Sequence, residues 1–502
     1  MPSAEAAEVV IGVDLGTSAV KVLAVTASGQ EITTASQAYG LETPQADFVE
    51  QDPGVVYGAA MHALAGVLAD LRVRGSEVAA IGFSSAMHGL LCVDDSGEPL
   101  SRVITWMDRR AHAIADKWRS DGTALALYAS TGAPMHPMLP IAKLRWLAEN
   151  QPDLFAKTRR FVGLKEFFVF RWTGEWLVDH GIASATGMLD LRTRDWHARA
   201  LELARVQPDR LARPAPPSTA LRSFRPEVAR ELGLAKPTAI VLGSSDGALA
   251  NIGVGASGRD DVALTLGTSG AVRIVLGETL LDAGGRTFCY CADDTSYVIG
   301  GPTSAAGASL EWIFALLLDE IAPDLRFARA AELASQVAPG AGGLVVLPFF
   351  AGERAPYWNS ELRGAFDGLD LAHDRRTILR AAFESVVFGV YSVYDVVREL
   401  SRDARRLLLS GGLTRSPLVR QLLADVFGVP AVQSREHEAS AFGAALLAAR
   451  AVGLIDDAAA AARATGYDVP TQPNLELQAT YRAAFERYRR YVDAHLPLAT
   501  GR

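Results

Sequence analysis

The sequence is poor in cysteine, in long apolar runs and in positive charge. Its 502 residues contain three cysteines, Cys92, Cys289 and Cys291, too few for a disulfide framework. The apolar stretch LVVLPFFA from Leu344 falls far short of the roughly 20 residues of a membrane span. Lys and Arg number 49 against 57 Asp and Glu, a formal net charge of −8, which disfavours nucleic acid as the main partner. The first residues, MPSAEAAEVV, do not resemble a leader. We therefore expect a reduced, cytoplasmic protein without a membrane span.

What the sequence does contain is enough apolar material for more than one core. Hydrophobic residues make up 49% of the chain, and a single core rarely serves so many residues. The segment from 245 to 260 is dense in glycine and serine and predicts a domain boundary. We expect two domains or more.

An internal repeat relates the two halves. IGVDLGTSAVKVLAV from Ile11 returns in looser form as VALTLGTSGAVRIVL from Val262, and Leu15 matches Leu266 at an offset of 251 residues, half of the chain. Each copy places L-G-T-S between two apolar strands. This context favours a duplication over a chance match of common residue types.

Helix and strand patterns alternate in both halves, which predicts sheets covered by helices. The expected helices are 53–71, 304–318, 377–400 and one that begins at Ser416 and Pro417 as cap and first helical residue. The expected strands include 79–85, 103–108, 342–350 and 406–410. In the tail, Tyr481, Phe485, Tyr488 and Val492 have helical spacing and predict a docked C-terminal helix.

The first copy of the repeat has the features of a phosphate-binding turn. Gly16, Thr17 and Ser18 follow Asp14, and backbone N–H groups and hydroxyls in such a turn can hold phosphate oxygens. Asp14 could hold Mg²⁺, which prefers carboxylate oxygen. A plain β-hairpin is the alternative. No G-x-x-x-x-G-K-[ST] motif is present in the sequence.

The second copy, GTSG at 267–270, strengthens this interpretation. Two related phosphate turns suggest a nucleotide in a cleft between similar domains. Gly411 and Gly412, after a buried strand, indicate a place where the backbone comes close to a flat ring, with a ligand-free helix-entry turn as the alternative.

Asp246 in GSSDGALANIG lies where a glycine- and serine-rich loop meets an expected helix start. An ionised aspartate facing a cleft could accept the proton of an attacking hydroxyl. A helix N-cap is an equally common role for such a residue.

Two further segments contain candidate substrate contacts. Met87 and His88 stand where a strand ends, although a histidine there is more often a structural hydrogen-bonding group. Trp106, Asp108 and Arg109 cluster in TWMDRR, a combination that suits a hydroxylated small molecule. Cys289 and Cys291 do not form a zinc site without further ligands.

Taken together in this order, the motifs resemble those of the FGGY family of carbohydrate kinases over nearly the whole chain. Residues 138–150, MLPIAKLRWLAEN, match the first family signature throughout. Residues 364–384 match the second, except that Thr377 replaces an acidic, amide or histidine side chain; threonine also caps helices, so little is put in doubt.

The resemblance implies an α/β fold of two ribonuclease-H-like domains, of the actin and hexokinase type, with a central cleft. It implies a sugar-binding domain at 1–250, a nucleotide-binding domain at 251–452 and a C-terminal helical extension at 453–502. Asp246 would be the general base, and Asp14 and Asp246 would hold Mg²⁺. ATP would meet a set of residues from both halves: Thr17, Ser18, Lys21, Gly267, Thr268, Gly307, Glu311, Gly411, Gly412 and Ser416. The family often has asparagine in place of Ser416. The sugar would contact Met87, His88, Trp106, Asp108, Met138 and Asp246.

Within the family, these motifs are most similar to those of gluconate kinases, with xylulose kinases next. A gluconate pocket needs a cation or several donors for the carboxylate, and His88, His136 and Arg109 are available. We expect ATP-dependent conversion of gluconate to 6-phosphogluconate by a protein that forms a homodimer and binds neither nucleic acid nor membrane. A non-catalytic ATP-binding scaffold of the actin and chaperone type is the alternative from another class.

Overall fold

The computed structural model describes residues 8–74, 76–222, 224–234, 237–435 and 438–499. The chain forms two compact units, each assembled from several stretches of sequence. The first unit comprises Met1–Ser257, Val275–Val298 and Glu438–Gly466, and the second comprises Gly258–Ile274, Ile299–His437 and Tyr467–Arg502. The predicted leader-free N-terminus, residues 1–7, lies outside the described residues.

The first large sheet has six strands in the order β13-β14-β5-β1-β2-β3. Their bounds are β1 Glu8–Leu15, β2 Ala19–Thr26, β3 Glu31–Ala38, β5 Glu77–Ser85, β13 Ala220–Leu221 and β14 Ala239–Ser245. β1 pairs in parallel with β5 and antiparallel with β2, while β5 pairs in parallel with β14. The carboxyl ends of β1, β5 and β14 therefore meet at one edge of the sheet, where Asp14 and Asp246 are found.

The second large sheet also has six strands, in the order β17-β18-β16-β15-β21-β22. Their bounds are β15 Gly258–Leu266, β16 Gly270–Leu276, β17 Phe288–Cys291, β18 Tyr297–Thr303, β21 Arg406–Ser410 and β22 Ala431–Gln433. The order β18-β16-β15-β21-β22 reproduces β3-β2-β1-β5-β14 of the first sheet. This common topology confirms the predicted repeat, and the two sheets confirm the predicted α/β class.

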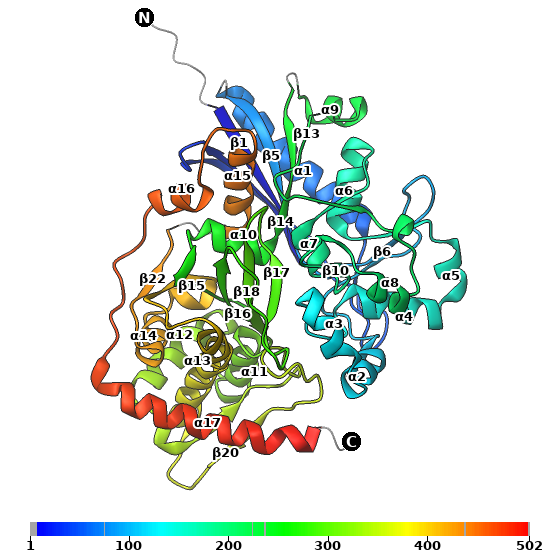
Figure 1. The fold of residues 1–502 in the computed structure, drawn as a ribbon. Coiled ribbons are helices and arrows are strands. Elements are labelled where there is room, and N and C mark those ends of the chain that lie inside the picture. The colour runs from blue at the N-terminus through cyan, green and yellow to red at the C-terminus, as the bar shows by residue number, and fades with distance from the viewer. Residues whose placement is uncertain (1–7, 75, 223, 235–236, 436–437, 500–502) are drawn as a thin grey trace, which may run out of the picture. The chain divides into compact units, whose positions relative to one another are not determined.

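Smaller elements surround the two sheets (Figure 1). The helices are α2 His112–Ser120, α3 Thr123–Thr131, α4 Pro140–Asn150, α5 Pro152–Lys157, α6 Leu164–Thr173, α7 His180–Ser184, α8 Ala198–Ala204, α9 Pro226–Leu232, α10 Asp246–Gly253, α12 Pro323–Ser335 and α16 Ala458–Ala464. The short strands are β4 Glu50–Gln51, β6 Leu91–Val93, β7 Val103–Ile104, β8 Arg160–Val162, β9 Leu177–Asp179, β10 Leu189–Asp190, β11 Asp195–Trp196, β12 Arg213–Ala215, β19 Val345–Leu347 and β20 Ala365–Asp367.

Four predicted helices are present with small changes of bounds. α11 spans Gly307–Leu317, α13 spans Arg375–Leu400, and α14 spans Pro417–Phe427 with Ser416 as its N-cap, as predicted. α13 begins two residues early because the Asp374 carboxylate accepts the N–H groups of Arg376 and Thr377. The strand expected at 342–350 shrinks to β19 because the preceding glycines form a turn, with φ +61° at Gly342.

The longest apolar helix of the first unit is α1, Pro53–Val73. By length and composition it could cross a membrane, unlike the short apolar stretch at Leu344. One such helix is weak support for a span, because core helices meet the same criterion. Val56, Leu64 and Leu68 are buried in the core of the first unit with strands β1 and β2.

Helix α15, Ala439–Ala451, belongs to the first unit although it follows the second sheet in sequence (Figure 1). Glycines allow its backbone to approach: a Cβ at Gly12 would lie 1.8 Å from the Ala441 carbonyl oxygen, and one at Gly443 would lie 2.0 Å from that of Leu249. α15 thereby packs on β1 and on helix α10, which begins at Asp246.

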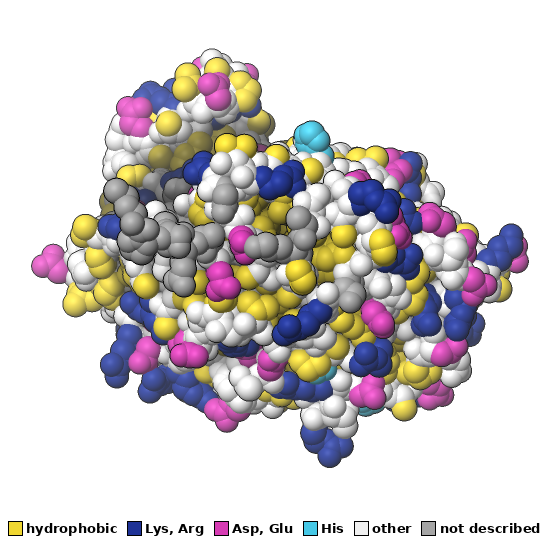
Figure 2. Space-filling view, turned by 90° about the horizontal axis from the view of Figure 1, so that it is seen from above, with side chains coloured by type: hydrophobic (Ala, Val, Ile, Leu, Met, Phe, Trp, Pro, Cys, Tyr) yellow, Lys and Arg dark blue, Asp and Glu magenta, His cyan; other side chains and the backbone are white. Residues whose placement is uncertain are grey.

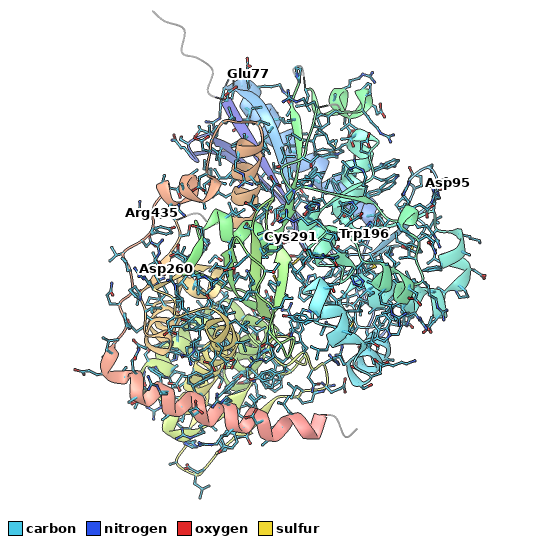
Figure 3. All side chains as sticks on the ribbon, viewed as in Figure 1. Glu77, Asp95, Trp196, Asp260, Cys291 and Arg435 are labelled. Carbon is cyan, nitrogen blue, oxygen red and sulfur yellow. The ribbon has the colours of Figure 1, made fainter. Side chains whose placement is uncertain are left out.

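Helix α17, Gln478–Ala499, packs on α13 and α14 in the second unit. Tyr481, Phe485, Tyr488 and Val492 are all buried, which confirms the predicted docked face. On the molecular face shown in Figure 2, basic and acidic side chains alternate and no broad patch carries a single sign. All three cysteines are free and buried, among them Cys291 on β17 (Figure 3).

Candidate active site

The first repeat turn joins β1 to β2 and is a tight β-hairpin. The Gly16 N–H donates to the Ala19 carbonyl at 3.1 Å. The Thr17 carbonyl accepts from Gln51 Nε2 at 2.5 Å, and the Thr17 hydroxyl accepts from Trp106 Nε1 at 2.8 Å. A small cavity of about 20 Å³ beside the turn is lined by residues that include Thr17, Met87 and Trp106. The fold therefore joins predicted phosphate contacts to predicted sugar contacts.

The Asp14 side chain is partly buried and lies next to this turn. Its Oδ1 accepts the Ser84 hydroxyl at 2.6 Å, from the residue directly opposite on β5. The pKa of Asp14 is raised to about 6, chiefly by burial and also by the nearby Asp246 carboxylate, while the Ser84 hydrogen bond opposes the shift. Two carboxylates that disfavour each other's charge form an environment that a cation would stabilise.

Asp246 is the first residue of α10, and its carboxylate is partly exposed. The N-cap is Ser245, whose hydroxyl accepts the Ala248 N–H at 3.4 Å, so the N-cap alternative for Asp246 is wrong. The β14 register shifts between Val241 and Ser244. Gly243 makes the shift possible: its φ is +67°, and a Cβ there would lie 1.7 Å from the Phe83 carbonyl oxygen.

Lys21 lies on β2, and its ammonium pairs with the Glu438 carboxylate at 2.6 Å, with both side chains partly exposed. Ser18 is exposed at the turn, where its carbonyl accepts the Tyr39 N–H at 2.9 Å. A phosphate contact by Lys21 would therefore replace or share this ion pair.

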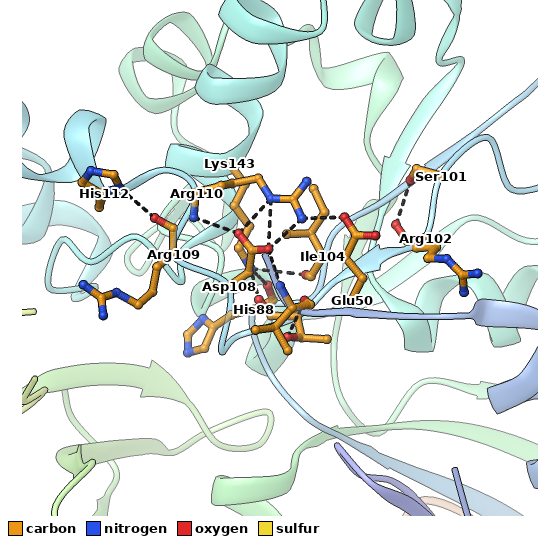
Figure 4. Close-up of polar contacts among 12 residues, drawn as sticks. Glu50, His88, Ser101, Arg102, Ile104, Asp108, Arg109, Arg110, His112 and Lys143 are labelled. Carbon is orange, nitrogen blue, oxygen red and sulfur yellow. Dashed lines mark hydrogen bonds and ion pairs between the residues drawn. The ribbon is translucent and has the colours of Figure 1, made fainter. Parts of the chain in front are cut away.

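The Met87 and His88 loop follows β5. His88 is buried with φ +67°, and its Nδ1 donates to the Ala185 carbonyl at 2.7 Å. The buried Lys143 ammonium donates to the carbonyls of His88 and Thr105, each at 2.7 Å. Burial lowers the pKa of Lys143 to about 7. Lys143, a residue of the first signature, thus fixes the backbone of both predicted sugar-contact segments (Figure 4).

Asp108 has a structural position that the sequence argument did not foresee. It is 1% exposed, and its two oxygens accept from Arg110 Nε and Nη2 and from the Val49 N–H. Arg110 also pairs with Glu50 at 2.5 Å (Figure 4). Both oxygens of Asp108 are thus engaged by the protein, and its role as a substrate contact stays a prediction.

The other candidates near this loop are buried or paired. Met138 is 1% exposed, and its N–H donates to His136 Nδ1 at 3.2 Å. Arg109 lies 3.7 Å from the Asp47 carboxylate, with its side chain partly exposed. Their substrate roles stay predictions.

The second repeat turn joins β15 to β16 in the second unit. The Gly267 N–H donates to the Ser269 carbonyl at 2.9 Å, and the N–H groups of Gly307 and Ala308 donate to the Gly267 and Thr268 carbonyls at 3.0 Å. Helix α11 therefore begins directly against the turn. A Cβ at Gly307 would lie 2.5 Å from the Gly267 carbonyl oxygen, so only glycine permits this approach.

Gly411 approaches the same turn from β21. Its φ is +92°, and a Cβ there would lie 2.4 Å from the Leu266 carbonyl oxygen. Gly412 is exposed with open space around it. Glu311 is exposed one turn into α11, and Ser416 caps α14 without a side-chain bond. The structure thus gathers Gly267, Thr268, Gly307 and Gly411 around one turn and places Glu311 and Ser416 on neighbouring helices.

Sequence reasoning missed three positions. Ser84 bonds Asp14, Gln51 bonds the Thr17 carbonyl, and Lys165 forms a buried ion pair with Asp179. Only Ser84 gave a usable signal, since it ends a predicted strand in the same way as Asp14. The other contacts depend on the three-dimensional fold.

The residues of the first unit fit a magnesium ion. Asp14 and Asp246 supply carboxylate oxygens, and their mutual repulsion would be relieved by a divalent cation. Within the described part of the chain, no group of three or more His, Cys, Asp or Glu side chains is arranged to hold a metal. A magnesium ion here would therefore keep several waters and phosphate oxygens among its ligands.

Comparisons with known proteins agree with this arrangement. Residues 9–253 match the N-terminal domain and residues 262–452 the C-terminal domain of the FGGY family of carbohydrate kinases. A gluconokinase of Bacillus subtilis is 35% identical over 453 residues, 89% of this chain and 88% of the relative. The crystal structure of a gluconate kinase from Lactobacillus acidophilus superposes with a TM-score of 0.93 at 32% identity, covering 99% of each chain. A ligand-bound xylulose kinase from the same organism gives 0.92 at 32%, covering 97% of this chain and 98% of that one.

These matches confirm the two-domain, actin- and hexokinase-like fold. They favour a carbohydrate kinase over a non-catalytic ATP-binding scaffold. The chain belongs to the FGGY family of carbohydrate kinases.

Proposed function

We propose that this kinase transfers the γ-phosphoryl group of ATP to gluconate, forming 6-phosphogluconate and ADP. The observation that supports this most is the strand edge that brings Asp14 and Asp246 into electrostatic contact beside the Thr17 turn. A phosphate turn, a carboxylate pair and a polar loop in one unit are the parts that sugar phosphorylation requires.

In the proposed reaction, Asp246 accepts the proton of the attacking sugar hydroxyl while that oxygen bonds the γ-phosphorus and ADP leaves. Thr17 and Ser18 donate to the phosphoryl oxygens from the first turn, and Lys21 contributes positive charge. Mg²⁺ held by Asp14 and Asp246 would neutralise charge on the phosphates. Because phosphoryl transfer has a loose transition state, these residues mainly position the reactants and stabilise charge.

We further propose that the second unit binds adenosine through Gly307, Glu311, Gly411, Gly412 and Ser416, and that Gly267 and Thr268 meet the phosphates. Along the sequence, we propose a sugar-binding domain at 1–250, a nucleotide-binding domain at 251–452 and a helical extension at 453–502, with residues 275–298 and 438–466 packed in the first unit and 467–502 in the second. The open position of Gly412 supports backbone contact with a ring. Cytoplasmic location and a homodimer stay predictions.

Gluconate is proposed over xylulose because the gluconokinase is 35% identical over most of the chain and because potential donors occur in the predicted sugar-contact segments. These are Arg109, which lies 3.7 Å from Asp47, and two histidines, His88, which bonds Ala185, and His136, which accepts the Met138 N–H. A carboxylate on the substrate would be stabilised by such donors. Xylulose is the second candidate, supported by the similar structural match.

The test is a coupled assay of ADP release with Mg-ATP across gluconate, xylulose, ribulose, glycerol and no sugar. We expect the highest kcat/KM with gluconate and little ADP release without sugar. The Asp246→Asn variant, purified in the same way, measures the background from contaminating enzymes. Preference for xylulose would replace the substrate assignment, and sugar-independent ADP release in the wild type would contradict the kinase function.

A further inference from the structure

Lys165, on helix α6, is buried and contacts the strand that leads to the proposed catalytic base, Asp246. Its side chain is 2% exposed, and its ammonium has two partners on different elements. Nζ lies 2.5 Å from Asp179 Oδ2, on a side chain with no exposure, and donates to the Ser244 carbonyl at 2.9 Å. Lys165 therefore ties together α6, the start of α7 and the end of β14.

The Ser244 contact is close to the chemistry. Ser244 precedes Asp246 by two residues and follows the register shift at Gly243. Helix α7 packs against the same residue, since a Cβ at Gly181 would lie 2.2 Å from the Ser244 hydroxyl oxygen. The path of the chain into Asp246 is thus set by a strand irregularity, a close helix contact and the Lys165 hydrogen bond.

The Asp179 partner extends the connection to the sugar loop. Its Oδ1 accepts the Ile182 N–H at 2.9 Å and so caps α7. Just beyond the other end of α7, the Ala185 carbonyl accepts from His88 Nδ1. The same ion pair therefore supports both the strand leading to Asp246 and the helix that holds the His88 ring.

Stability alone does not account for this ion pair. Buried ion pairs can often be replaced by neutral side chains of similar shape without loss of stability. What a neutral apolar side chain cannot reproduce is the hydrogen bond to the Ser244 carbonyl. This bond separates a positioning role from a purely structural one.

We propose that Lys165 is a positioning residue for phosphoryl transfer, acting by holding the Ser244 carbonyl so that the Asp246 carboxylate stands at the attacking hydroxyl. The proposal rests on the proposed role of Asp246 as general base. Lys165 itself touches neither the sugar nor ATP.

The experiment compares two variants that leave no unpaired buried carboxylate. Asp179→Asn keeps Lys165 and the α7 cap, since the amide oxygen can accept the Ile182 N–H. Lys165→Met/Asp179→Asn removes in addition the buried ammonium charge and its bond to Ser244, so the matched Lys165→Gln/Asp179→Asn variant, which also lacks the charge, isolates the bond. We expect the double variant to lose kcat on the order of 10- to 100-fold relative to Asp179→Asn, the size expected when a reacting group is misplaced by about an ångström. KM values for sugar and ATP should change less than about threefold, because ground-state contacts remain.

Two further measurements keep the proposal falsifiable. In Lys165→Gln/Asp179→Asn the amide can still donate to Ser244, so kcat should recover in part while the thermal midpoint matches that of the Met variant. Hydrogen exchange of peptides spanning 243–247 in the resting protein should be several-fold faster in the Met variant than in Asp179→Asn. Equal exchange in the two, or equal kcat, would overturn the proposal.

These readouts distinguish the two hypotheses. If the wild type releases no ADP with any sugar, the proposed function fails, and the exchange rates still decide whether Lys165 holds the strand end. If Asp246→Asn retains wild-type kcat, the base assignment fails, and with it the catalytic part of the Lys165 proposal.

Discussion

The two repeat turns occupy the same place in their sheets and differ in chemistry. In the first, Asp14 stands opposite Ser84 on the parallel neighbour β5, and the serine hydroxyl donates to the carboxylate at 2.6 Å. In the second, the matching residue is Thr265, opposite Ser410 on β21, and the two hydroxyl oxygens are 2.9 Å apart. The same site offers a charge in one unit and a neutral hydroxyl in the other.

This difference indicates how a duplicated fold divides labour. The hairpin and its parallel serine neighbour occur in both units, so they suit a purpose common to both, such as phosphate contact. The carboxylate at the turn occurs in the first unit, together with Asp246. We therefore expect substitutions in the first turn to affect turnover and those in the second to affect nucleotide binding.

The largest effect should come from Asp246→Asn. Loss of the proton acceptor should lower kcat on the order of 10²-fold or more, while the fold and ATP affinity are kept. Steady-state kinetics and equilibrium titration with ATP measure the two quantities separately. Near-normal turnover would remove Asp246 from the mechanism and with it the functional asymmetry of the units.

The next effect tests the turns as a matched pair. Asp14→Asn should lower kcat on the order of 10- to 100-fold at fixed Mg²⁺, the size seen when groups around a metal site are altered. Thr265→Val, at the equivalent position, removes a neutral hydroxyl and should leave kcat within about threefold. Magnesium titrations of both variants provide the measurement, and equal losses would show that the turns are chemically equivalent.

A smaller effect is expected from Gly307→Ala in the second unit. The added methyl would meet the Gly267 carbonyl at 2.5 Å and push α11 away from the turn. Overpacking of this kind costs about 1–3 kcal/mol, so the KM for ATP should rise on the order of tenfold with the sugar KM unchanged. Gly66→Ala, in open space within α1, is the control and should leave both KM values unaffected. A rise in the sugar KM instead would contradict the division between the units.

The smallest effect concerns stability alone and involves the carboxyl group of Glu166 at the start of α6. Burial raises the pKa of Glu166 to about 7 from 4.5, so the folded protein retains a proton that the unfolded chain releases. Its stabilising contribution is therefore complete below pH 4.5 and is lost as the pH rises through 7. In Glu166→Gln, the decrease in the free energy of unfolding between pH 5 and pH 8 should be smaller by up to about 3 kcal/mol. Urea unfolding at the two pH values measures this difference. Parallel pH dependence of variant and wild type would show that Glu166 does not ionise in this window.

The sequence predicted features that depend on neighbours along the chain. The repeat turns, the Ser416 cap, the long helix α13 and the buried face of α17 all follow local patterns of capping and spacing. The positions of Asp14 near the end of a strand and of Asp246 at a helix start also follow from the glycine and serine beside them.

Features set by distant contacts could not be predicted in this way. Lys165 bonds a carbonyl 79 residues away, and Arg110 engages Asp108 together with Glu50, 60 residues earlier. Helix α15 joins the first unit because its backbone fits against Gly12 of β1 and Gly82 of β5, a match visible only after folding. The same limit applies to Asp108, since one sequence does not show which side chain donates to a given carboxylate.

The hydrogen bond between Trp106 and Thr17 makes the fluorescence of Trp106 sensitive to ligands at the first turn. The indole N–H only donates, so the Thr17 hydroxyl accepts it and keeps its own proton for a phosphate oxygen. An anion that accepts a hydrogen bond from this hydroxyl will polarise it and so strengthen the hydrogen bond that the hydroxyl oxygen accepts from the indole. Among the eight tryptophans of the chain, Trp106 should therefore dominate the change in emission when ATP binds, and Trp106→Phe should abolish most of that change.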